Sequence, residues 1–412
     1  MSSDAFQPIS FKSGLTVKNR MVKAAMEENL ATAEQTPGKT LRTLYEAWSK
    51  GGVGLIITGN VMVDHLAMTG PGGVVLEKNT DLQAFSQWAK SAKHEGTRAI
   101  MQINHPGRQV FKKMGGKVLS PSDVALNMGK HSGLFGQPKP MTEAEIQDVI
   151  DRFTHTAVQA KLAGFDGVQV HAAHGYLISQ FLSPLVNKRQ DAWGGSLENR
   201  AKLLLAVVDS IIEACGSDFS VSVKLNSADF QRGGFAEEDA QQVVSLLAQR
   251  HVDFVELSGG SYEAPAMQGR TADQRTLDRE AYFLEFAEVI ANKTSLPIMT
   301  TGGITKLKTV ERVLASGVAM VGMASALASR PDLPNRWKSA PETLGSIPRV
   351  NWQDKTLSGL AVMAMVKRQL RQMGKGKTPK LNLNPAFTLF TEQLRSASLT
   401  KRYRKRYANQ VK

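Results

Sequence analysis

Short runs of β-branched and apolar residues recur eight times along this sequence, and most of them are followed by a longer helical pattern. The runs span residues 21–25, 54–58, 99–103, 167–171, 221–225, 252–257, 297–301 and 318–323. Buried strands that alternate with amphipathic helices form a parallel sheet, because each crossover helix covers one face of the sheet. Eight such units favour an α/β fold closed into a (β/α)8 TIM barrel over an open, doubly wound sheet.

The segments between these runs carry signals of helix boundaries. Thr142-Glu-Ala-Glu145 is a capping box, which predicts a helix over residues 142–162. Further helices are expected over residues 201–215, 237–249 and 305–316. An open dinucleotide-binding sheet would need G-x-G-x-x-G after its first strand, and that motif is missing, as is the Walker motif. The barrel interpretation is compatible with both absences.

Cysteine content and hydropathy exclude several classes of protein. Cys215 is the only cysteine, so a disulfide scaffold, an iron–sulfur cluster and a Cys-rich zinc site are excluded. Residues 1–20 lack the apolar core of a signal peptide. The longest uncharged run, residues 313–329, contains two glycines and three serines and reads as a buried strand with its flanks. We expect a cytoplasmic protein without a membrane partner.

Positive charge is concentrated near the C-terminus. Residues 351–412 carry 14 Lys and Arg against two acidic residues, so they hold +12 of the formal net charge of +14. The predicted division is therefore a barrel over residues 1–345 and a basic, partly helical C-terminal extension over residues 346–412. The end of the extension, Lys401-Arg-Tyr-Arg-Lys-Arg-Tyr407, could bind phosphates of nucleic acid or an anionic membrane. No nucleic-acid module accompanies it, so nucleic acid is not an expected partner.

One helix is expected inside the extension. Its apolar face is predicted to consist of Leu360, Met363, Val366 and Leu370. The same helix would bear Lys367, Arg368 and Arg371. Packing of this face on the barrel or on a second copy in a homo-oligomer is the favoured interpretation, and an interfacial membrane helix is the alternative.

Active residues of a (β/α)8 barrel lie at the carboxyl ends of the strands and in the loops that follow. This rule selects Gln102, His171, Lys224 and the segment Thr301-Gly302-Gly303. The loops after the third and fourth strands, residues 104–141 and 172–196, are long, and long ordered loops in a compact domain are usually functional.

Two imidazoles and a phenol follow the fourth strand in His171-Ala-Ala-His174-Gly175-Tyr176. Such donors can hydrogen-bond a carbonyl oxygen and stabilise negative charge that develops there, and a phenol can supply a proton to carbon. The H-x-x-H spacing also occurs in metal sites, but no third ligand accompanies it, so no metal is expected. Tyr176 taken alone could equally be a buried core tyrosine.

The stretch from His171 to Arg200 closely resembles the signature of the old yellow enzyme family of FMN-dependent NADH:flavin oxidoreductases. It continues through Gln180, Ser183-Pro184, Asn187, Arg189, Asp191, Gly194-Gly195-Ser196 and Glu198-Asn199-Arg200. The resemblance extends over about residues 5–345 and includes Lys18-Asn19-Arg20, Gly52-Val-Gly54, Gly107-Arg108, Phe165-Asp166-Gly167, Gly233-Gly234-Phe235 and Arg279-Glu280-Ala281-Tyr282-Phe283-Leu284.

This resemblance implies a barrel that holds FMN at its mouth and a ping-pong cycle. NADH or NADPH would act as a transient reductant of the flavin. Hydride would then pass to the β-carbon of an activated alkene, commonly an α,β-unsaturated carbonyl compound. By matching positions, His171 and His174 would bind the carbonyl oxygen, with Asn29 near the substrate, and Tyr176 would protonate the α-carbon.

The resemblance also implies a set of FMN-binding residues. Gln102 would bond the pyrimidine edge of the flavin, and Lys224 would lie near its N1–C2 carbonyl, where the family usually has Arg. The amides of Gly302 and Gly303 would hold the phosphate. The remaining predicted cofactor residues are Ala24, Ala25, Met26, Glu27, Asn60, Ala324 and Ser325.

Three positions depart from the family pattern. Glu27 stands where Thr or Cys usually bonds the flavin C4 carbonyl, and our hypothesis is a neutral Glu27 that donates a hydrogen bond. Ala324-Ser325 replaces a Gly-Arg pair, so one phosphate cation is missing and another base such as Arg330 would be needed. Lys224 replaces a bidentate guanidinium with a point charge.

Two other functions remain open from the residues alone. Lys224 in a barrel strand could form a Schiff base, as in an aldolase-like lyase. A degenerate barrel could instead bind a partner through its basic tail. In the oxidoreductase interpretation, residues 104–141 and 259–278 would shape the substrate pocket.

Overall fold

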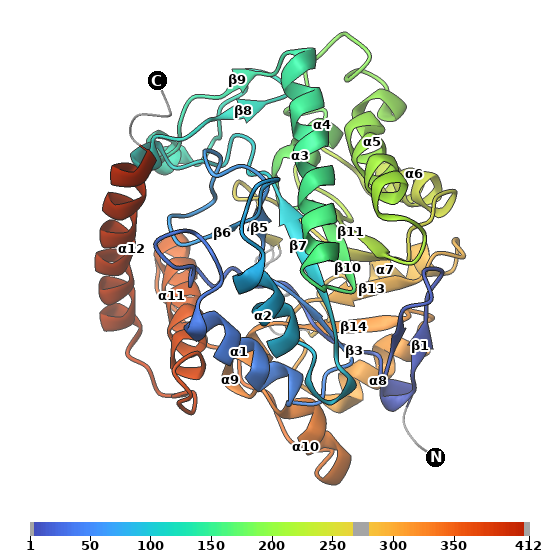
Figure 1. The fold of residues 1–412 in the computed structure, drawn as a ribbon, viewed down its shortest axis with the longest axis vertical. Helices are drawn as coiled ribbons and strands as arrows, with labels where there is room; N and C mark the ends of the chain where they lie inside the picture. The colour runs from blue at the N-terminus through green and yellow to red at the C-terminus, as the bar shows by residue number, and fades with distance from the viewer. Residues whose placement is uncertain (1–3, 267–279, 408–412) are drawn as a thin grey trace.

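The computed structural model describes residues 4–266 and 280–407. In these residues eight parallel strands close into a barrel, because the strand that begins the series pairs with the one that ends it. The strands, in spatial order, are β3 (Met21–Lys23), β4 (Leu55–Ile57), β7 (Arg98–Asn104), β10 (Gly167–Ala172), β11 (Ser220–Asn226), β12 (Phe254–Ser258), β13 (Ile298–Thr301) and β14 (Met320–Met323). Each strand overlaps one of the eight predicted runs, so the predicted TIM barrel is confirmed (Figure 1).

Helices surround this barrel, as the alternating pattern predicted (Figure 1). Their bounds are α1 (Lys39–Ser49), α2 (Gln83–Ser91), α3 (Glu143–Leu162), α4 (Leu177–Leu182), α5 (Leu197–Cys215), α6 (Glu237–Ala248), α7 (Leu284–Ala291), α8 (Leu307–Ala315), α9 (Ser325–Ser329) and α10 (Leu333–Ser339). The predicted capping box opens α3, where the Thr142 hydroxyl accepts from the Glu145 N–H at 3.2 Å and Glu145 Oε2 accepts from the Thr142 N–H at 2.8 Å. Helix α5 begins earlier than predicted because Ser196 caps it through the Asn199 N–H.

Six short strands of the described residues lie outside the eight-stranded barrel. β5 (Val61–Met62) and β6 (Val74–Val75) continue the sheet beyond β7, and β8 (Leu119–Ser120) pairs with β9 (Lys139–Pro140). β1 (Ile9–Ser10) and β2 (Thr16–Val17) form an antiparallel hairpin whose Val17 joins the apolar interior of the barrel. That interior core includes Val22, Leu55, Ile100, Phe254 and Met320.

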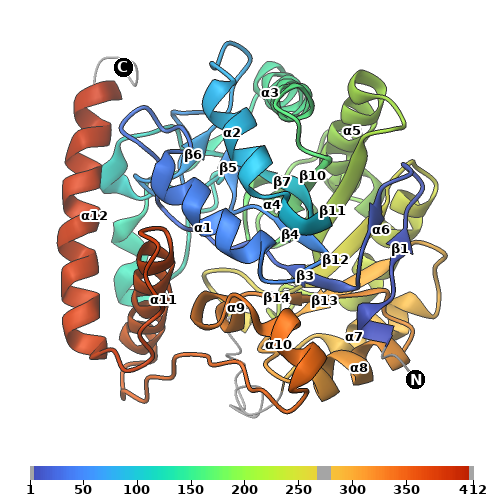
Figure 2. The same ribbon diagram turned by 60° about the horizontal axis from the view of Figure 1, so that its bottom comes forward.

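Two long helices, α11 (Lys355–Met373) and α12 (Pro385–Tyr407), lie side by side against the barrel (Figures 1 and 2). The predicted apolar face of α11 is partly wrong. Leu370 is fully buried, but the Leu360 and Met363 side chains are 39% and 38% exposed. Small residues are buried in their place, among them Ser358 and Ala361, because a small side chain lets the helix approach the barrel closely.

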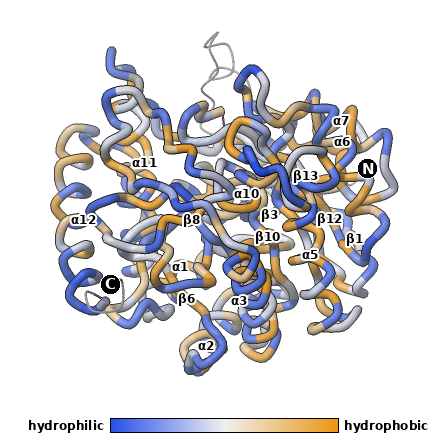
Figure 3. Tube along the Cα trace, turned by 90° about the horizontal axis from the view of Figure 1, so that it is seen from above, coloured by the Kyte–Doolittle hydropathy of each residue, from blue (hydrophilic) through white to orange (hydrophobic). Residues whose placement is uncertain are grey.

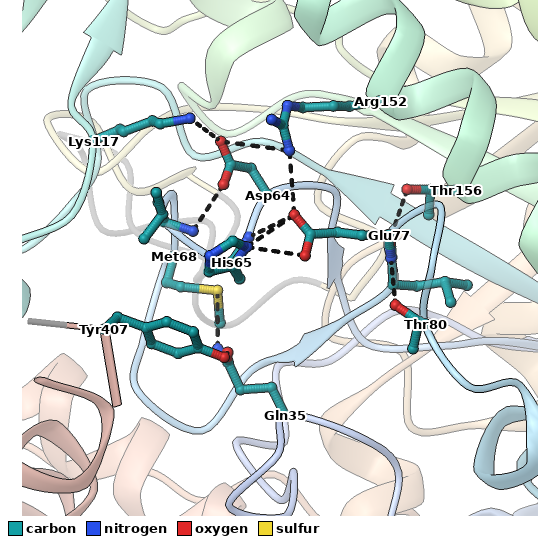
Figure 4. Close-up of polar contacts among 12 residues, drawn as sticks. Gln35, Asp64, His65, Met68, Glu77, Thr80, Lys117, Arg152, Thr156 and Tyr407 are labelled. Carbon is teal, nitrogen blue, oxygen red and sulfur yellow. Dashed lines mark hydrogen bonds and ion pairs between the residues drawn. The ribbon is translucent and has the colours of Figure 1, made fainter. Parts of the chain in front are cut away.

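The aromatic residues of the basic tail pack on the barrel body. Tyr403 and Tyr407 are buried, the Tyr403 hydroxyl donates to the His65 carbonyl at 2.7 Å, and the Tyr407 hydroxyl donates to Gln35. The Tyr407 and His65 ring centroids lie 4.8 Å apart (Figure 4). The end of α12 is hydrophilic (Figure 3), and Arg404, Lys405 and Arg406 lie between the two tyrosines in its last turn. The tyrosines of the tail are therefore used for docking.

Charged side chains link the loops next to this docking point (Figure 4). Lys117 lies 2.9 Å from Asp64, and Arg152 lies 3.2 Å from Glu77 and 3.9 Å from Asp64. His65 Nδ1 lies 2.9 Å from Glu77. One ligand atom from each of Asp64, His65 and Glu77 falls within 4.8 Å of the others, and the two cations neutralise both carboxylates. The network connects the region of β5 and β6 to α3.

None of the helices within residues 4–266 and 280–407 combines the length and the hydropathy that a bilayer crossing requires.

Candidate active site at the barrel mouth

A continuous chain of hydrogen bonds crosses the upper part of the barrel. Gln102 Nε2 donates to Gln169 Oε1 at 2.7 Å, and Gln169 Nε2 donates to Glu256 Oε2 at 2.9 Å. Lys224 Nζ lies 2.7 Å from Glu256 Oε1. The register explains these contacts, since Gln102 is level with Gln169 and Lys224 is level with Glu256 on neighbouring strands. The chain brings together the two predicted flavin contacts, Gln102 and Lys224.

Gln169 and Glu256 were not predicted as site residues. Their signal was available, because each is a polar residue inside an otherwise apolar strand, and both are fully buried. Lys224 Nζ is buried and lies 2.7 Å from the Glu256 carboxylate, so it is not free to attack a carbonyl carbon. The geometry therefore disfavours the Schiff-base alternative.

His171, near the end of β10, comes together with His174 and Tyr176, which follow the strand, as predicted. The His171 ring lies edge-on to both other rings, at a centroid distance of 5.1 Å from His174 and 4.9 Å from Tyr176. The turn between them is tight, since His174 has φ +62° and Gly175 has φ +74°. A non-glycine residue in the left-handed region is uncommon and is kept there only by its surroundings. These positive φ values direct the three side chains into one cluster.

Several contacts hold His174 in this conformation. Its N–H donates to Asn226 Oδ1 at 3.1 Å, and its carbonyl accepts from Gln109 Nε2 at 3.0 Å. Its ring Nε2 lies 2.7 Å from the Ser258 hydroxyl at the end of β12. Three neighbouring segments thus position one imidazole, which is the kind of support that a preorganised site needs.

All three side chains are in their neutral forms at neutral pH. Burial, followed by the nearby Lys224 charge, lowers the pKa of His171 and of His174 well below the usual histidine value. His171 Nδ1 accepts the Ala173 N–H at 3.2 Å, which leaves the proton of this ring on Nε2. Burial, with added effects of Tyr262 and Glu27, raises the pKa of Tyr176 well above its usual value. The site therefore presents hydrogen-bond donors without a histidine charge.

Tyr262, from the loop after β12, is a site residue that the sequence reasoning missed. Its hydroxyl lies 3.1 Å from the Tyr176 hydroxyl. An ion pair of 2.6 Å between Arg108 and Glu263 ties this loop to the loop after β7. The two predicted pocket loops are therefore linked through their described parts, and residues 267–278 of the second loop lie outside the described residues.

The hypothesis of a neutral Glu27 is wrong, because the structure gives this carboxylate a cation. Lys367 Nζ of α11 lies 3.1 Å from Glu27 Oε2, and the Thr69 hydroxyl donates to Glu27 Oε1 at 2.7 Å. Burial opposes ionisation of Glu27, but the Lys367 charge and these hydrogen bonds outweigh it and lower the pKa of Glu27 below its usual value. Glu27 is therefore an ionised acceptor.

The same lysine connects the other predicted residues of this side of the mouth. Lys367 Nζ donates to Asn29 Oδ1 at 2.6 Å, and Asn60 Nδ2 donates to the Thr69 hydroxyl at 3.4 Å. Asn29, Glu27 and Asn60 thus belong to one network with Thr69 and Lys367. Thr69 was not predicted at all, and Lys367 was predicted only as a cation on the helix of the extension, not as a site residue.

Two glycines with positive φ values lie directly after β13. Gly302 has φ +126° and Gly303 has φ +67°, and a Cβ atom on Gly303 would lie 2.5 Å from the Tyr282 ring. Ala324 and Ser325 lie at the start of the five-residue helix α9, and Arg330 follows its end. Arg349 is a further cation in this region, since its charge opposes the rise in the Tyr282 pKa that burial causes.

These groups fit FMN in their donor chemistry. Gln102 offers an amide, Lys224 offers an ammonium, and the Gly302-Gly303 backbone forms a turn that a side chain would block. Positive φ glycine amides next to β13 suit an anionic phosphate, since such backbone N–H groups form anion-binding concavities.

Comparisons with known proteins identify the family of the chain. The sequence profile of the NADH:flavin oxidoreductase / NADH oxidase family matches residues 4–343. The chain is 36% identical over 351 residues to the NADH-dependent flavin oxidoreductase iliE of Hypocrea jecorina, covering 79% of this chain and 87% of that protein. It is 33% identical over 333 residues to the NADH oxidase of Thermoanaerobacter brockii, covering 79% of this chain and 49% of that protein.

Two solved structures share the fold. A 2-naphthoyl-CoA reductase in complex with 2-naphthoyl-CoA matches with a TM-score of 0.78 and 23% identity, over 90% of this chain and 58% of that chain. The old yellow enzyme homologue from Zymomonas mobilis matches with a TM-score of 0.71 and 24% identity, over 84% and 95%. With the family match over residues 4–343, we conclude that the chain belongs to the NADH:flavin oxidoreductase / NADH oxidase family and is an FMN-dependent oxidoreductase of the old yellow enzyme type.

Proposed function

We propose that this protein reduces an activated alkene, such as an α,β-unsaturated carbonyl compound, in a ping-pong cycle with NADH or NADPH. The observation that carries the proposal is the cluster of three neutral donors, His171, His174 and Tyr176, beside Lys224 at the barrel mouth. FMN, when bound, supplies the hydride. The description of the Hypocrea jecorina relative as NADH-dependent favours NADH as the reductant.

The two histidines bind the carbonyl oxygen of the substrate in this proposal. His171 carries its proton on Nε2, because its Nδ1 accepts a backbone N–H. The Ser258 hydroxyl can donate to His174 Nε2, which leaves the His174 proton on Nδ1 for the substrate. Two N–H donors on one oxygen stabilise the negative charge that develops there when hydride reaches the β-carbon.

Tyr176 supplies the proton for the α-carbon. Its hydroxyl stays protonated because burial raises its pKa, and the Tyr262 hydroxyl at 3.1 Å can orient it. Lys224 lies beside the histidines, where its charge would stabilise the flavin pyrimidine ring, and Gln102 would bond the edge of that ring. We propose the Gly302 and Gly303 amides as the phosphate site, with Arg330 or Arg349 as the missing cation.

We propose that the barrel, residues 1–345, carries out the reaction. The extension, residues 346–412, completes the rim of the barrel mouth. The Lys367 contact with Glu27 supports this role of the extension. We propose a homo-oligomer in the cytoplasm as the working state of the protein.

A spectroscopic experiment tests the proposal directly. The visible spectrum of the purified protein is recorded, NADH or NADPH is added without oxygen, and an enone such as cyclohexenone follows. We expect a flavin band that NADH bleaches and that the enone restores. A protein that binds no FMN on reconstitution, or a bleached band that no activated alkene restores, would contradict the proposal.

The rate of alkene reduction is expected to be flat between about pH 6 and pH 8, because both histidines are already neutral at the lower end of this range. An exposed histidine would change its protonation state within this pH range. Stopped-flow measurement of the second half-reaction, started from protein that NADH has bleached, checks this. A transition in rate with an apparent pKa near the usual histidine value of 6.5 would show that a site histidine ionises.

The Lys367→Met variant is expected to lose about 1–3 kcal/mol of stability at pH 7, because the Glu27 carboxylate keeps its burial and loses its cation. The lowered pKa of Glu27 means that the pair stabilises the fold above the usual carboxyl pKa of 4.5 and that this stabilisation is lost as the pH falls through the lowered value. The difference between native protein and variant should therefore shrink in acid. Urea unfolding at pH 7 and at about pH 4 measures it.

A double-mutant cycle provides the control. Glu27→Gln combined with Lys367→Met should cost less than the sum of the two single losses, because no uncompensated carboxylate remains. Strictly additive losses would mean that the two side chains do not interact. The flavin midpoint potential should fall in Lys367→Met and rise in Glu27→Gln, which a purely structural role of Lys367 would not produce.

A further inference from the structure

A basic groove lies between α11 and α12, outside the barrel. It has a volume of about 260 Å³ and is lined by Arg368, Arg371, Gln372, Lys375, Thr391 and Arg395. Four of the six lining residues are cations, Gln372 adds a side-chain amide, and the Thr391 hydroxyl donates to backbone carbonyls of its own helix. A hollow lined in this way presents hydrogen-bond donors on both walls.

The groove holds more positive charge than its surroundings compensate. Glu392 pairs with Arg371 at 2.6 Å and lies 3.8 Å from Arg395. One carboxylate thus serves two guanidinium groups, and Arg368 and Lys375 add two more positive charges. Burial and the neighbouring Arg371 charge lower the pKa of Arg395, and Glu392 only partly opposes this. An anion in the groove would relieve this repulsion.

The groove adjoins the barrel mouth through Asn29. Arg395 Nη2, on one wall of the groove, donates to the Asn29 carbonyl at 2.6 Å. Lys367, one helical turn before Arg371, donates to the Asn29 side chain at 2.6 Å. A ligand that reaches from the groove past Asn29 would therefore enter the site that contains Glu27 and Tyr176.

We propose that this groove binds a phosphate or pyrophosphate group of a ligand whose other end reacts at the barrel mouth. Guanidinium groups match phosphate oxygens in paired hydrogen bonds, and three arginines converge here. The volume suits one or two phosphate groups rather than a whole dinucleotide. The role in turnover rests on the proposed function, whereas the anion site itself does not.

Two sources can supply this chemistry in the ping-pong cycle. One is the pyrophosphate or the 2′-phosphate of the nicotinamide reductant, and the other is a substrate esterified to a phosphorylated nucleotide carrier. The two half-reactions separate them, because the reductant acts only in the first and the substrate only in the second.

Binding to the full-length, FMN-loaded protein is tested first, with pyrophosphate and ADP as probes in calorimetric titrations at low salt. The double variant Arg368→Ser/Lys375→Ser should weaken binding of both probes by about tenfold to a hundredfold, since two charge-assisted contacts are lost. Its matched control is Lys401→Ser/Arg404→Ser, which removes two exposed cations from α12 beyond the groove and should bind as the native protein does. Lys375→Glu alone should weaken binding in the same direction.

Stopped-flow measurements of each half-reaction then identify the source. Weaker NADH or NADPH binding in the Arg368→Ser/Lys375→Ser variant, with an unchanged reaction with cyclohexenone, assigns the groove to the reductant. An unchanged first half-reaction, with a raised KM for an enoyl thioester of coenzyme A but not for cyclohexenone, assigns it to the substrate. Equal probe binding by the native protein, the double variant and the control overturns the proposal. A protein that binds pyrophosphate in the groove but reduces no alkene would instead refute the proposed function alone.

Discussion

The Tyr176→Phe variant is expected to keep its FMN and to react with NADH at the native rate, while the half-reaction with an enone slows by about 10²–10⁴-fold. The Tyr176 ring lies edge-on to the ring of His171, one of the two histidines proposed to bind the carbonyl oxygen, at a centroid distance of 4.9 Å. Burial keeps the proton of the Tyr176 hydroxyl in place at neutral pH. Phenylalanine preserves the ring packing and removes only the hydroxyl group that carries the proton. Stopped-flow absorbance of the flavin, read separately for each half-reaction, measures the effect.

Tyr262→Phe is the matched control for this prediction. It removes the hydroxyl that lies 3.1 Å from the Tyr176 hydroxyl and leaves the proposed donor intact. We expect a loss within about tenfold, the effect of one missing orienting hydrogen bond. If Tyr262→Phe slowed the enone reaction as much as Tyr176→Phe, or if Tyr176→Phe left it unchanged, Tyr176 would not be the proton donor.

The Glu256→Gln variant is expected to lose about 3–5 kcal/mol of unfolding free energy, because it leaves the Lys224 ammonium buried without a counter-charge. Both members of the pair are inaccessible, with side-chain exposures of 5% for Lys224 and 0% for Glu256. Glu256 also accepts from Gln169, so the substitution disturbs the bond that positions Gln102. Urea unfolding at pH 7, with the same excess of FMN for each protein, measures the loss.

Glu46→Gln is the control for charge loss without burial. Glu46 pairs with Lys50 at 2.6 Å, but the two side chains are 41% and 51% exposed, so we expect a change within about 0.5 kcal/mol. A second variant, Glu256→Leu with Lys224→Met, removes both charges and should recover part of the stability lost in Glu256→Gln. Equal losses in Glu46→Gln and Glu256→Gln would show that Lys224 is not desolvated.

The barrel could be predicted because its signal is local. Each strand is a short apolar run, and some helices show their own boundary signals, such as the capping box at Thr142. The failure on α11 is equally instructive. The helical period was correct, but Leu360 and Met363 were assigned to the buried face, whereas Ser358 and Ala361 occupy it. Hydrophobicity alone does not tell how closely two surfaces approach.

One part of the candidate site could be predicted from the sequence, and another part could not. His171, His174 and Tyr176 lie within six residues, and one tight turn brings their rings together. A local sequence pattern is therefore enough to predict this cluster. The charge state of Glu27 could not be predicted, because its cation, Lys367, lies 340 residues further along the chain.

The sequence by itself determined the eight strands, the helices α3, α5, α6 and α8, the three-residue donor cluster and the family. Those features depend on the periodicity of apolar residues and on contacts between residues that are close in the sequence. The tertiary structure alone decided that Lys224 pairs with Glu256, that Tyr262 faces Tyr176 and that α11 brings a lysine to Glu27. These are electrostatic contacts between distant segments, and their energies depend on burial and on distances of a few ångströms, which only the folded chain defines.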